Sequence, residues 1–110
     1  LTATASVVIW NCSFTGYDIG AAVKNGGMIG VEACTFRNNR IAFSYDTLSY
    51  FSFKGGFPDS TIEDNDIGIQ FVNIPGAMPL DFAGTVFSGN GIDIDNPIGY
   101  PIDLSNAIFK

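Results

Sequence analysis

The sequence contains no histidine, only five basic residues and no long apolar run. Without histidine, the chain has no Ser-His-Asp or Cys-His nucleophile and no imidazole ligand for zinc. The five basic residues form no cluster, and the formal net charge is −6, whereas a nucleic-acid surface needs gathered Lys and Arg side chains. No apolar run approaches the roughly 18 residues of a membrane-spanning segment. The sequence therefore predicts no nucleic-acid partner and no membrane span.

What the sequence does contain is a repeat built around an apolar anchor residue. The anchors are Phe14, Phe36, Ile62 and Phe87, and Phe109 begins a fifth repeat. Successive anchors lie 22, 26, 25 and 22 residues apart, and the length differences fall in loops between blocks of constant length. Apolar residues make up 46% of the chain, enough for the core of one domain. Repeats of this length are typical of solenoids, in which each repeat packs on the next.

Within each block the apolar residues alternate with period two, which predicts three short strands per repeat. On the strand after the second anchor, for example, Ile41, Phe43 and Tyr45 are expected to point inward. The small residues Gly20, Ala42 and Gly68, with Ala22 and Ser44, are expected to face outward. They leave either a flat face that another chain or a long glycan can approach, or an ordinary undecorated sheet.

A polar corner precedes this strand, with asparagine in the same place on three coils. The residues are Asn39, Asn65 and Asn90, and Tyr17 takes the place on the first coil. Asparagine and glycine tolerate left-handed backbone, and stacked asparagine side chains can hydrogen-bond from coil to coil. Both properties suit a corner that recurs on every coil.

Strands this short must be buried on the next coil, about 4.8 Å away, and parallel crossovers are overwhelmingly right-handed. We therefore predict an all-β fold, a right-handed parallel β-helix with three-strand coils of 22–26 residues and about four complete coils. The repeated Phe-x-x-Asn-x-Ile pattern resembles right-handed parallel β-helix proteins of the pectin-lyase-like superfamily and the repeats of large bacterial secreted or surface adhesins. The resemblance implies a structural or adhesive protein, or a polysaccharide lyase or hydrolase. Residues 1–110 are expected to form one segment of a longer repeat array.

Two long loops leave adjacent coils at the same corner, at residues 46–54 and 72–79. They place several apolar side chains outside the expected core, and such exposed patches mark partners or ligands. The patch residues are Leu48, Tyr50, Phe51, Phe53, Ile74 and Met78. Three interpretations stay open: the loops pack on each other, they contact another protein, or the aromatic rings form a platform for a sugar.

Asp93 and Asp95 alternate with Ile92 and Ile94, so both are expected to face solvent about 6.8 Å apart. That separation suits an inverting glycosidase pair, and the two carboxylates could also begin a calcium site. The same columns on coils two and three supply no acid or base, so solvated surface acids are the default interpretation. No catalytic residue, cofactor or metal is assigned.

Cys12 and Cys34 occupy the same inward column on adjacent coils. We expect free, buried thiols, with a disulfide as the open alternative. Taken together, the sequence predicts a non-enzymatic structural or adhesive segment of a large extracellular or cell-surface, fibre-like protein. Its expected partners are further copies, neighbouring segments of the same protein, or a glycan or other cell-surface ligand. The alternatives are part of a polysaccharide lyase or hydrolase and a non-catalytic glycan-binding module.

Overall fold

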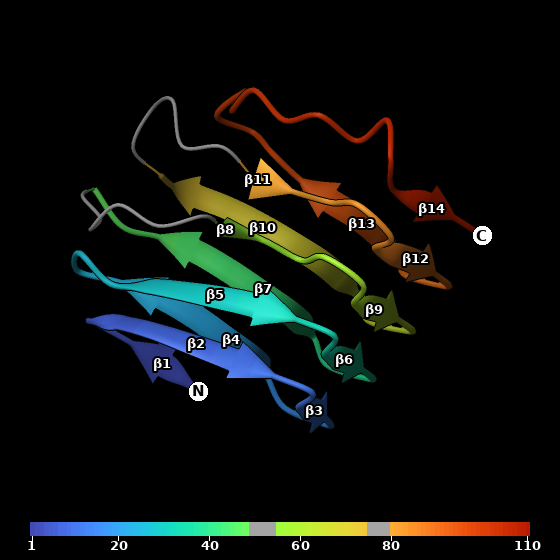
Figure 1. Ribbon diagram of the computed structural model, residues 1–110, viewed down its shortest axis with the longest axis horizontal. Coiled ribbons are helices and arrows are strands. Elements are labelled where there is room, and N and C mark those ends of the chain that lie inside the picture. Colours follow the sequence, from blue (N-terminus) through green and yellow to red (C-terminus); the bar gives the residue numbers. More distant parts are fainter. Residues whose placement is uncertain (49–54, 75–79) are drawn as a thin grey trace.

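The computed structural model describes residues 1–48, 55–74 and 80–110 (Figure 1). Within these ranges the chain forms strands and no helix. The strands are β1 (Thr2–Ala3), β2 (Ser6–Trp10), β3 (Ser13–Thr15), β4 (Ile19–Lys24), β5 (Met28–Glu32), β6 (Thr35–Arg37), β7 (Ile41–Asp46), β8 (Gly55–Gly56), β9 (Thr61–Glu63), β10 (Ile67–Asn73), β11 (Leu80–Asp81), β12 (Val86–Ser88), β13 (Ile92–Asp95) and β14 (Ile108–Phe109).

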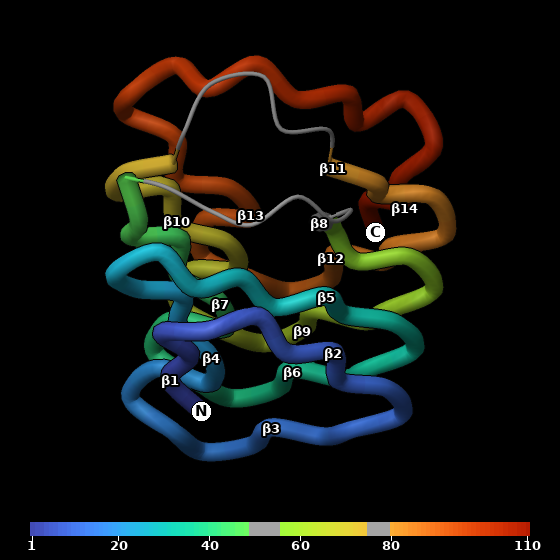
Figure 2. The backbone as a smooth tube through the Cα atoms, turned by 60° about the vertical axis from the view of Figure 1, so that its left-hand side comes forward, coloured from blue at the N-terminus to red at the C-terminus, as the bar shows by residue number. Residues whose placement is uncertain are grey.

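Every sheet is made of strands from successive repeats. One five-stranded sheet has the order β1-β4-β7-β10-β13, a second has the order β14-β12-β9-β6-β3, and two-stranded sheets join β2 to β5 and β8 to β11. All of these pairings are parallel. The chain therefore winds as a parallel β-solenoid of about four turns, as the tube in Figure 2 shows. The predicted all-β fold with parallel coils is confirmed.

The anchor residues stack directly above one another. Phe14 pairs with Phe36, Phe36 with Ile62, Ile62 with Phe87, and Phe87 with Phe109. The ring centroids are 5.0 Å apart in both the Phe14–Phe36 and the Phe87–Phe109 pairs, and both pairs are stacked. The strands thus pair in the register that the alignment of the repeats predicted.

Four fully buried aromatic side chains fill the middle of the solenoid. The Phe43 ring lies 4.8 Å from those of Tyr45 and Phe57, measured between centroids, and the Tyr45 and Phe71 rings stack at 5.3 Å. Burying one such side chain stabilises a fold by about 1.5–3 kcal/mol. These rings therefore join coils two and three through the core as well as through the strands.

The buried hydroxyl of Tyr45 has no hydrogen-bond partner among residues 1–48, 55–74 and 80–110. Burial raises the pKa of Tyr45 above 10.0, although the nearby Gly56 amide partly opposes the shift. Removing an unpaired buried hydroxyl is neutral to favourable, so Tyr45→Phe is expected to stabilise the fold by about 0.5–1 kcal/mol. Because tyrosine ionises more easily in the unfolded chain, wild type loses stability as the pH rises above about 10, and the advantage of the variant widens. Urea denaturation at pH 7 and pH 10.5 tests this, and a less stable variant would contradict it.

The strands after the polar corner do not alternate as predicted. Ala42 is 0% exposed and belongs to the core, as does its neighbour Phe43. A Cβ built on Gly20 would lie 3.3 Å from the Phe36 ring, and one built on Gly68 would also contact an anchor side chain. Two successive residues, Ala42 and Phe43, are thus both buried in the core. The prediction that Gly20, Ala42 and Gly68 form a flat outer face is wrong.

The first residue of each of these strands differs in burial from coil to coil. Ile19, Ile41, Ile67 and Ile92 pair in register across four coils. Ile41 is buried, Ile19 and Ile67 are half-buried, and Ile92 is exposed. Counting back by twos from Phe43 predicts that Ile41 points inward, and Ile41 is buried as predicted.

The predicted asparagine column is a hydrogen-bond ladder. The Asn39 amide nitrogen donates to Asn65 Oδ1 at 3.1 Å, and the Asn65 amide nitrogen donates to Asn90 Oδ1 at 3.0 Å. The same two nitrogens also donate to the backbone carbonyls of Phe14 and Phe36, each at 3.1 Å. Asn39 and Asn65 are buried, so the ladder supplies hydrogen-bond partners to side-chain amides that water cannot reach. Coil-to-coil hydrogen bonding by the asparagines is confirmed.

Left-handed backbone lies one residue before each asparagine of the column, and before Tyr17 on the first coil. It occurs at Gly16, Asn38, Asp64 and Gly89, whose φ angles range from 56° to 79°. Asn39, Asn65 and Asn90 themselves do not have positive φ. The prediction assigned left-handed backbone and coil-to-coil hydrogen bonding to the same asparagine. In the structure the left-handed residue turns the chain, and the asparagine after it forms the hydrogen bonds.

Charged side chains decorate the outside of this corner in matched pairs. Arg37 forms an ion pair with Glu63, and Arg40 forms one with Asp18, whose Oδ2 lies 3.2 Å from Arg40 Nη2. The hydrogen bond from Arg40, with the attraction of its charge, lowers the pKa of Asp18. Each pair joins adjacent coils, although exposed pairs of this kind add little stability.

Candidate functional site

The corner from which the two long loops leave contains a cavity of about 430 Å³. It opens between the ends of β4, β7 and β10, so successive coils contribute equivalent residues to its wall. The lining residues are Lys24, Asn25, Gly26, Asp46, Thr47, Leu48 and Asn73. We call this the loop-corner cavity.

The polar groups of the loop-corner cavity are largely bonded to one another. Lys24 Nζ lies 3.6 Å from Asp46 Oδ2, and Asn73 donates to Asp46 Oδ1 at 3.0 Å. The Gly26 amide donates to Thr47 Oγ1 at 2.7 Å, and the Thr47 amide donates to the Asn73 carbonyl at 3.0 Å. Asp46 therefore has a cation and an amide beside it. The cavity therefore offers polar contacts for a ligand and no acid–base pair among the described residues.

Only two residues of the predicted apolar patch fall in the described part of the chain. Leu48 is 82% exposed and lines the loop-corner cavity. Ile74 is half-buried and packs against the main core. Tyr50, Phe51, Phe53 and Met78 lie outside the described residues. The patch thus stays a prediction, with Leu48 as an exposed apolar contact and Ile74 at the edge of the core.

The two carboxylates of the alternative acid pair have different surroundings. Asp93 follows the column of Gly20, Ala42 and Gly68, and its Oδ1 accepts a hydrogen bond from the Asn90 amide at 3.0 Å. It is half-buried at the end of the asparagine ladder. Asp95 pairs instead with Gln70 on the neighbouring strand. Both side chains are half-buried, and the acid pair stays a prediction.

A metal ion is held by several ligand side chains that lie close together in space. Among residues 1–48, 55–74 and 80–110, no three His, Cys, Asp or Glu side chains lie close enough together to hold a metal ion. The same ranges contain no helix long and apolar enough to cross a membrane. The calcium site considered for Asp93 and Asp95 therefore finds no third carboxylate in the described part.

Cys12 and Cys34 are free thiols, and they belong to a second ladder. Each thiol donates to the backbone carbonyl two residues earlier, that of Trp10 and that of Glu32 respectively, at 3.4 and 3.3 Å. The Cys12 amide donates to Cys34 Sγ at 3.4 Å, and the Cys34 amide donates to Ser60 Oγ at 3.1 Å. Burial raises the pKa of Cys34. The thiols therefore act as hydrogen-bonding groups equivalent to the Ser60 hydroxyl, and Cys34 is kept protonated.

Sequence reasoning did not single out Trp10, although the structure leaves it 69% exposed. It is the single tryptophan of the chain and ends β2 at a two-residue corner. Its exposure could have been predicted from its place in the repeat, because Trp10 stands in an outward column with Glu32, Pro58 and Ala83. A large aromatic ring in such a column is a candidate contact residue.

Comparison with protein-family models, with curated proteins and with solved structures found no match. The parallel β-solenoid therefore rests on the strand pairing and register of the chain itself. The resemblance to the pectin-lyase-like superfamily remains an expectation from the repeat pattern.

Proposed function

We propose that this chain is a structural, non-enzymatic β-solenoid segment of a large extracellular or cell-surface protein, where it serves as a stiff spacer or fibre that also supports adhesion. One observation carries the proposal: the connections from coil to coil are continuous along the described stack. Strand pairing, the asparagine ladder and the stacked anchors all join each coil to the next.

This arrangement suits a spacer because its stiffness comes from repetition. Each added coil contributes the same set of contacts and extends the stack by about 4.8 Å. The formal net charge of −6 favours a hydrated surface. Contact with further copies or neighbouring segments belongs to the proposal, and the exposed Leu48 beside the loop-corner cavity supports it.

Stretching single molecules tests the mechanical part. The chain is placed between two marker domains and pulled, with a Gly/Ser linker of the same length as control. We expect force-resisting unfolding events whose length gains are multiples of about 80–95 Å, the extended length of 22–26 residues at about 3.6 Å each. A featureless extension like that of the linker would refute the spacer role.

Location and chemistry are tested separately. In intact cells of the source organism, added protease is expected to cleave the native protein, and protection until lysis would exclude a surface location. Incubation with acidic and neutral polysaccharides is expected to release no products. Turnover that disappears in an Asp93→Asn/Asp95→Asn double variant would replace the structural proposal by the enzyme alternative.

A further inference from the structure

The sequence contains two Asn-Gly steps, Asn25-Gly26 and Asn90-Gly91, and the structure gives them opposite surroundings. An Asn-Gly step is labile because the backbone nitrogen of the glycine can attack the asparagine side-chain carbon Cγ, and glycine has no side chain to obstruct the approach. Asparagine is for this reason among the thermolabile residues of proteins. The fold decides which step reacts, because it fixes how freely the two reacting groups can meet.

The Asn25-Gly26 step lies in an exposed turn between β4 and β5. The φ angles of Asn25 and Gly26 are 51° and 88°, both positive as a type I′ turn requires, and the Gly27 amide closes the turn on the Lys24 carbonyl at 2.9 Å. Asn25 is exposed, and its side-chain amide has no hydrogen-bond partner in the described part of the chain. The Gly26 nitrogen donates to Thr47 Oγ1 at 2.7 Å, and this bond has to open before the nitrogen can attack.

The Asn90-Gly91 step is held by the asparagine ladder. Asn90 Oδ1 accepts hydrogen bonds from the backbone and side-chain nitrogens of Asn65, each at 3.0 Å. Asn90 Nδ2 donates to the Ile62 carbonyl at 2.9 Å and to Asp93 Oδ1 at 3.0 Å. The Gly91 nitrogen donates to the Asn65 carbonyl at 3.0 Å. These bonds oppose the rotation that would bring Cγ of Asn90 to the Gly91 nitrogen, so the fold restrains this step and leaves the side chain of the first one loose.

We propose that Asn25 is a site of spontaneous deamidation in the folded chain, and that the asparagine ladder protects Asn90 from the same reaction. The Gly26 nitrogen forms a bond to Cγ of Asn25, and the side-chain nitrogen leaves as ammonia with the proton that Gly26 gives up. A cyclic succinimide remains, and one water molecule opens it at either carbonyl. The products are aspartate and isoaspartate. The net change is hydrolysis of the side-chain amide to a carboxylate, which needs water and no oxidant or enzyme.

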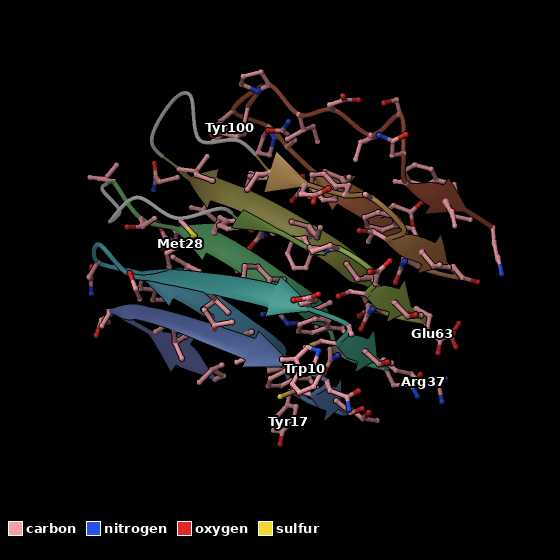
Figure 3. All side chains as sticks on the ribbon, in the orientation of Figure 1. Trp10, Tyr17, Met28, Arg37, Glu63 and Tyr100 are labelled. Carbon is pink, nitrogen blue, oxygen red and sulfur yellow. The ribbon has the colours of Figure 1, made fainter. Side chains whose placement is uncertain are left out.

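The reaction changes both the charge and the backbone of this corner. Asn25 lines the loop-corner cavity, so the new carboxylate stands in the cavity wall that also contains the Lys24–Asp46 pair. In isoaspartate the main chain runs through the side-chain carbon and is longer by one methylene group. The fully buried Met28, labelled in Figure 3, begins β5 directly after the turn and fixes its far end. The lengthened turn therefore loses the hydrogen bond from Gly27 to Lys24.

The two steps are compared within one molecule by incubating the whole folded chain at pH 8 and 37 °C. Asn25 is expected to lose its amide at least about tenfold faster than Asn90, because its reacting groups are freed by a smaller local opening. Pepsin digestion in acid and mass spectrometry measure each site separately, since deamidation raises the mass of the peptide that contains it. In concentrated urea the turn and the ladder are both lost, so the two rates are expected to agree within about twofold.

A variant separates the added charge from the lengthened backbone. Asn25→Asp carries the new carboxylate on an ordinary main chain, so its Gly27 amide is expected to exchange with solvent at the wild-type rate within about twofold. In the isoaspartate fraction of aged wild type, purified by anion exchange, the same amide is expected to exchange at least about fivefold faster, because its hydrogen bond to Lys24 is lost. An unchanged circular dichroism spectrum confirms that both forms keep the solenoid.

Equal rates for Asn25 and Asn90 in the folded chain would overturn the proposal, as would an Asn25 that stays intact when folded and reacts in urea. A rate difference that persists in urea would assign it to local sequence and remove the protective role of the ladder. Equal exchange of Gly27 in both forms would remove the effect on the turn. None of these outcomes bears on resistance to stretching, so the modification site and the spacer role fail independently.

Discussion

Replacing Asn65 by alanine is expected to lower the free energy of unfolding by about 3–4 kcal/mol. The Asn65 side chain is buried and bonds in both directions along the stack: Oδ1 accepts from the Asn39 amide groups, and Nδ2 donates to Phe36 O and Asn90 Oδ1. Alanine leaves several of these groups buried without partners. Each such group costs about 1–3 kcal/mol, partly relieved if water enters. Urea denaturation measures the loss.

A matched control is Asn73→Ala, which removes an exposed asparagine with one hydrogen bond to Asp46. Its expected cost is below about 1 kcal/mol, because water replaces the lost partner. Asn65→Asp adds a second comparison, since it keeps the shape and loses the donors, and it should be at least as unstable as alanine at pH 7. Equal stability of the Asn65→Ala and Asn73→Ala variants would show that the ladder does not hold the coils together.

Much of the fold was predictable because solenoid packing repeats one set of constraints. Anchors such as Phe36 and Ile62 recur at intervals that the loops explain, and the structure pairs them as aligned. The asparagine ladder was predictable for the same reason, since a polar residue recurring in a buried column must bond along the column. Repetition reveals a residue's column, and it says less about the direction of its side chain.

The direction of side chains was predicted less well than their columns on the strands after the polar corner. A period-two count assumes an extended strand, and Ala42 with Phe43 breaks that assumption by placing two neighbours inside. Asp93, in the same column, is half-buried and accepts a hydrogen bond from Asn90 at the end of the asparagine ladder. Left-handed residues were misplaced by one position, because glycine, asparagine and aspartate all occur there and at adjacent sites. No local signal distinguishes these positions without the neighbouring coil.

The candidate site was predicted less well than the fold. Long loops identified the corner that contains the loop-corner cavity, with Leu48 in its wall. The cavity's remaining polar residues, among them Lys24 and Asn73, were not singled out, because they become neighbours only when three coils stack. Trp10 was overlooked because the search followed loops, whereas this ring stands at a short corner that no loop marks.

Replacing Gly68 by alanine is expected to destabilise the fold by about 2–3 kcal/mol, even though the substitution adds a single methyl group. A Cβ at this position would lie 2.4 Å from the backbone carbonyl oxygen of Asp93 on the next coil and 3.2 Å from Ile62 Cγ2. The nearer contact is with backbone, so rotation of a side chain cannot relieve it. Coils three and four must then separate locally, which weakens the hydrogen bond from the Ile92 amide to the Asp66 carbonyl.

The control for this substitution is Gly16→Asn at the asparagine corner. Gly16 has φ of 79° and no heavy atom within 4 Å of a built Cβ, and the equivalent coil-two residue is Asn38, so asparagine should cost less than about 1 kcal/mol. Urea denaturation compares the two variants, and hydrogen exchange of the Ile92 amide locates the damage. If Gly68→Ala is as stable as Gly16→Asn and that amide stays protected, close approach of coils three and four does not require glycine.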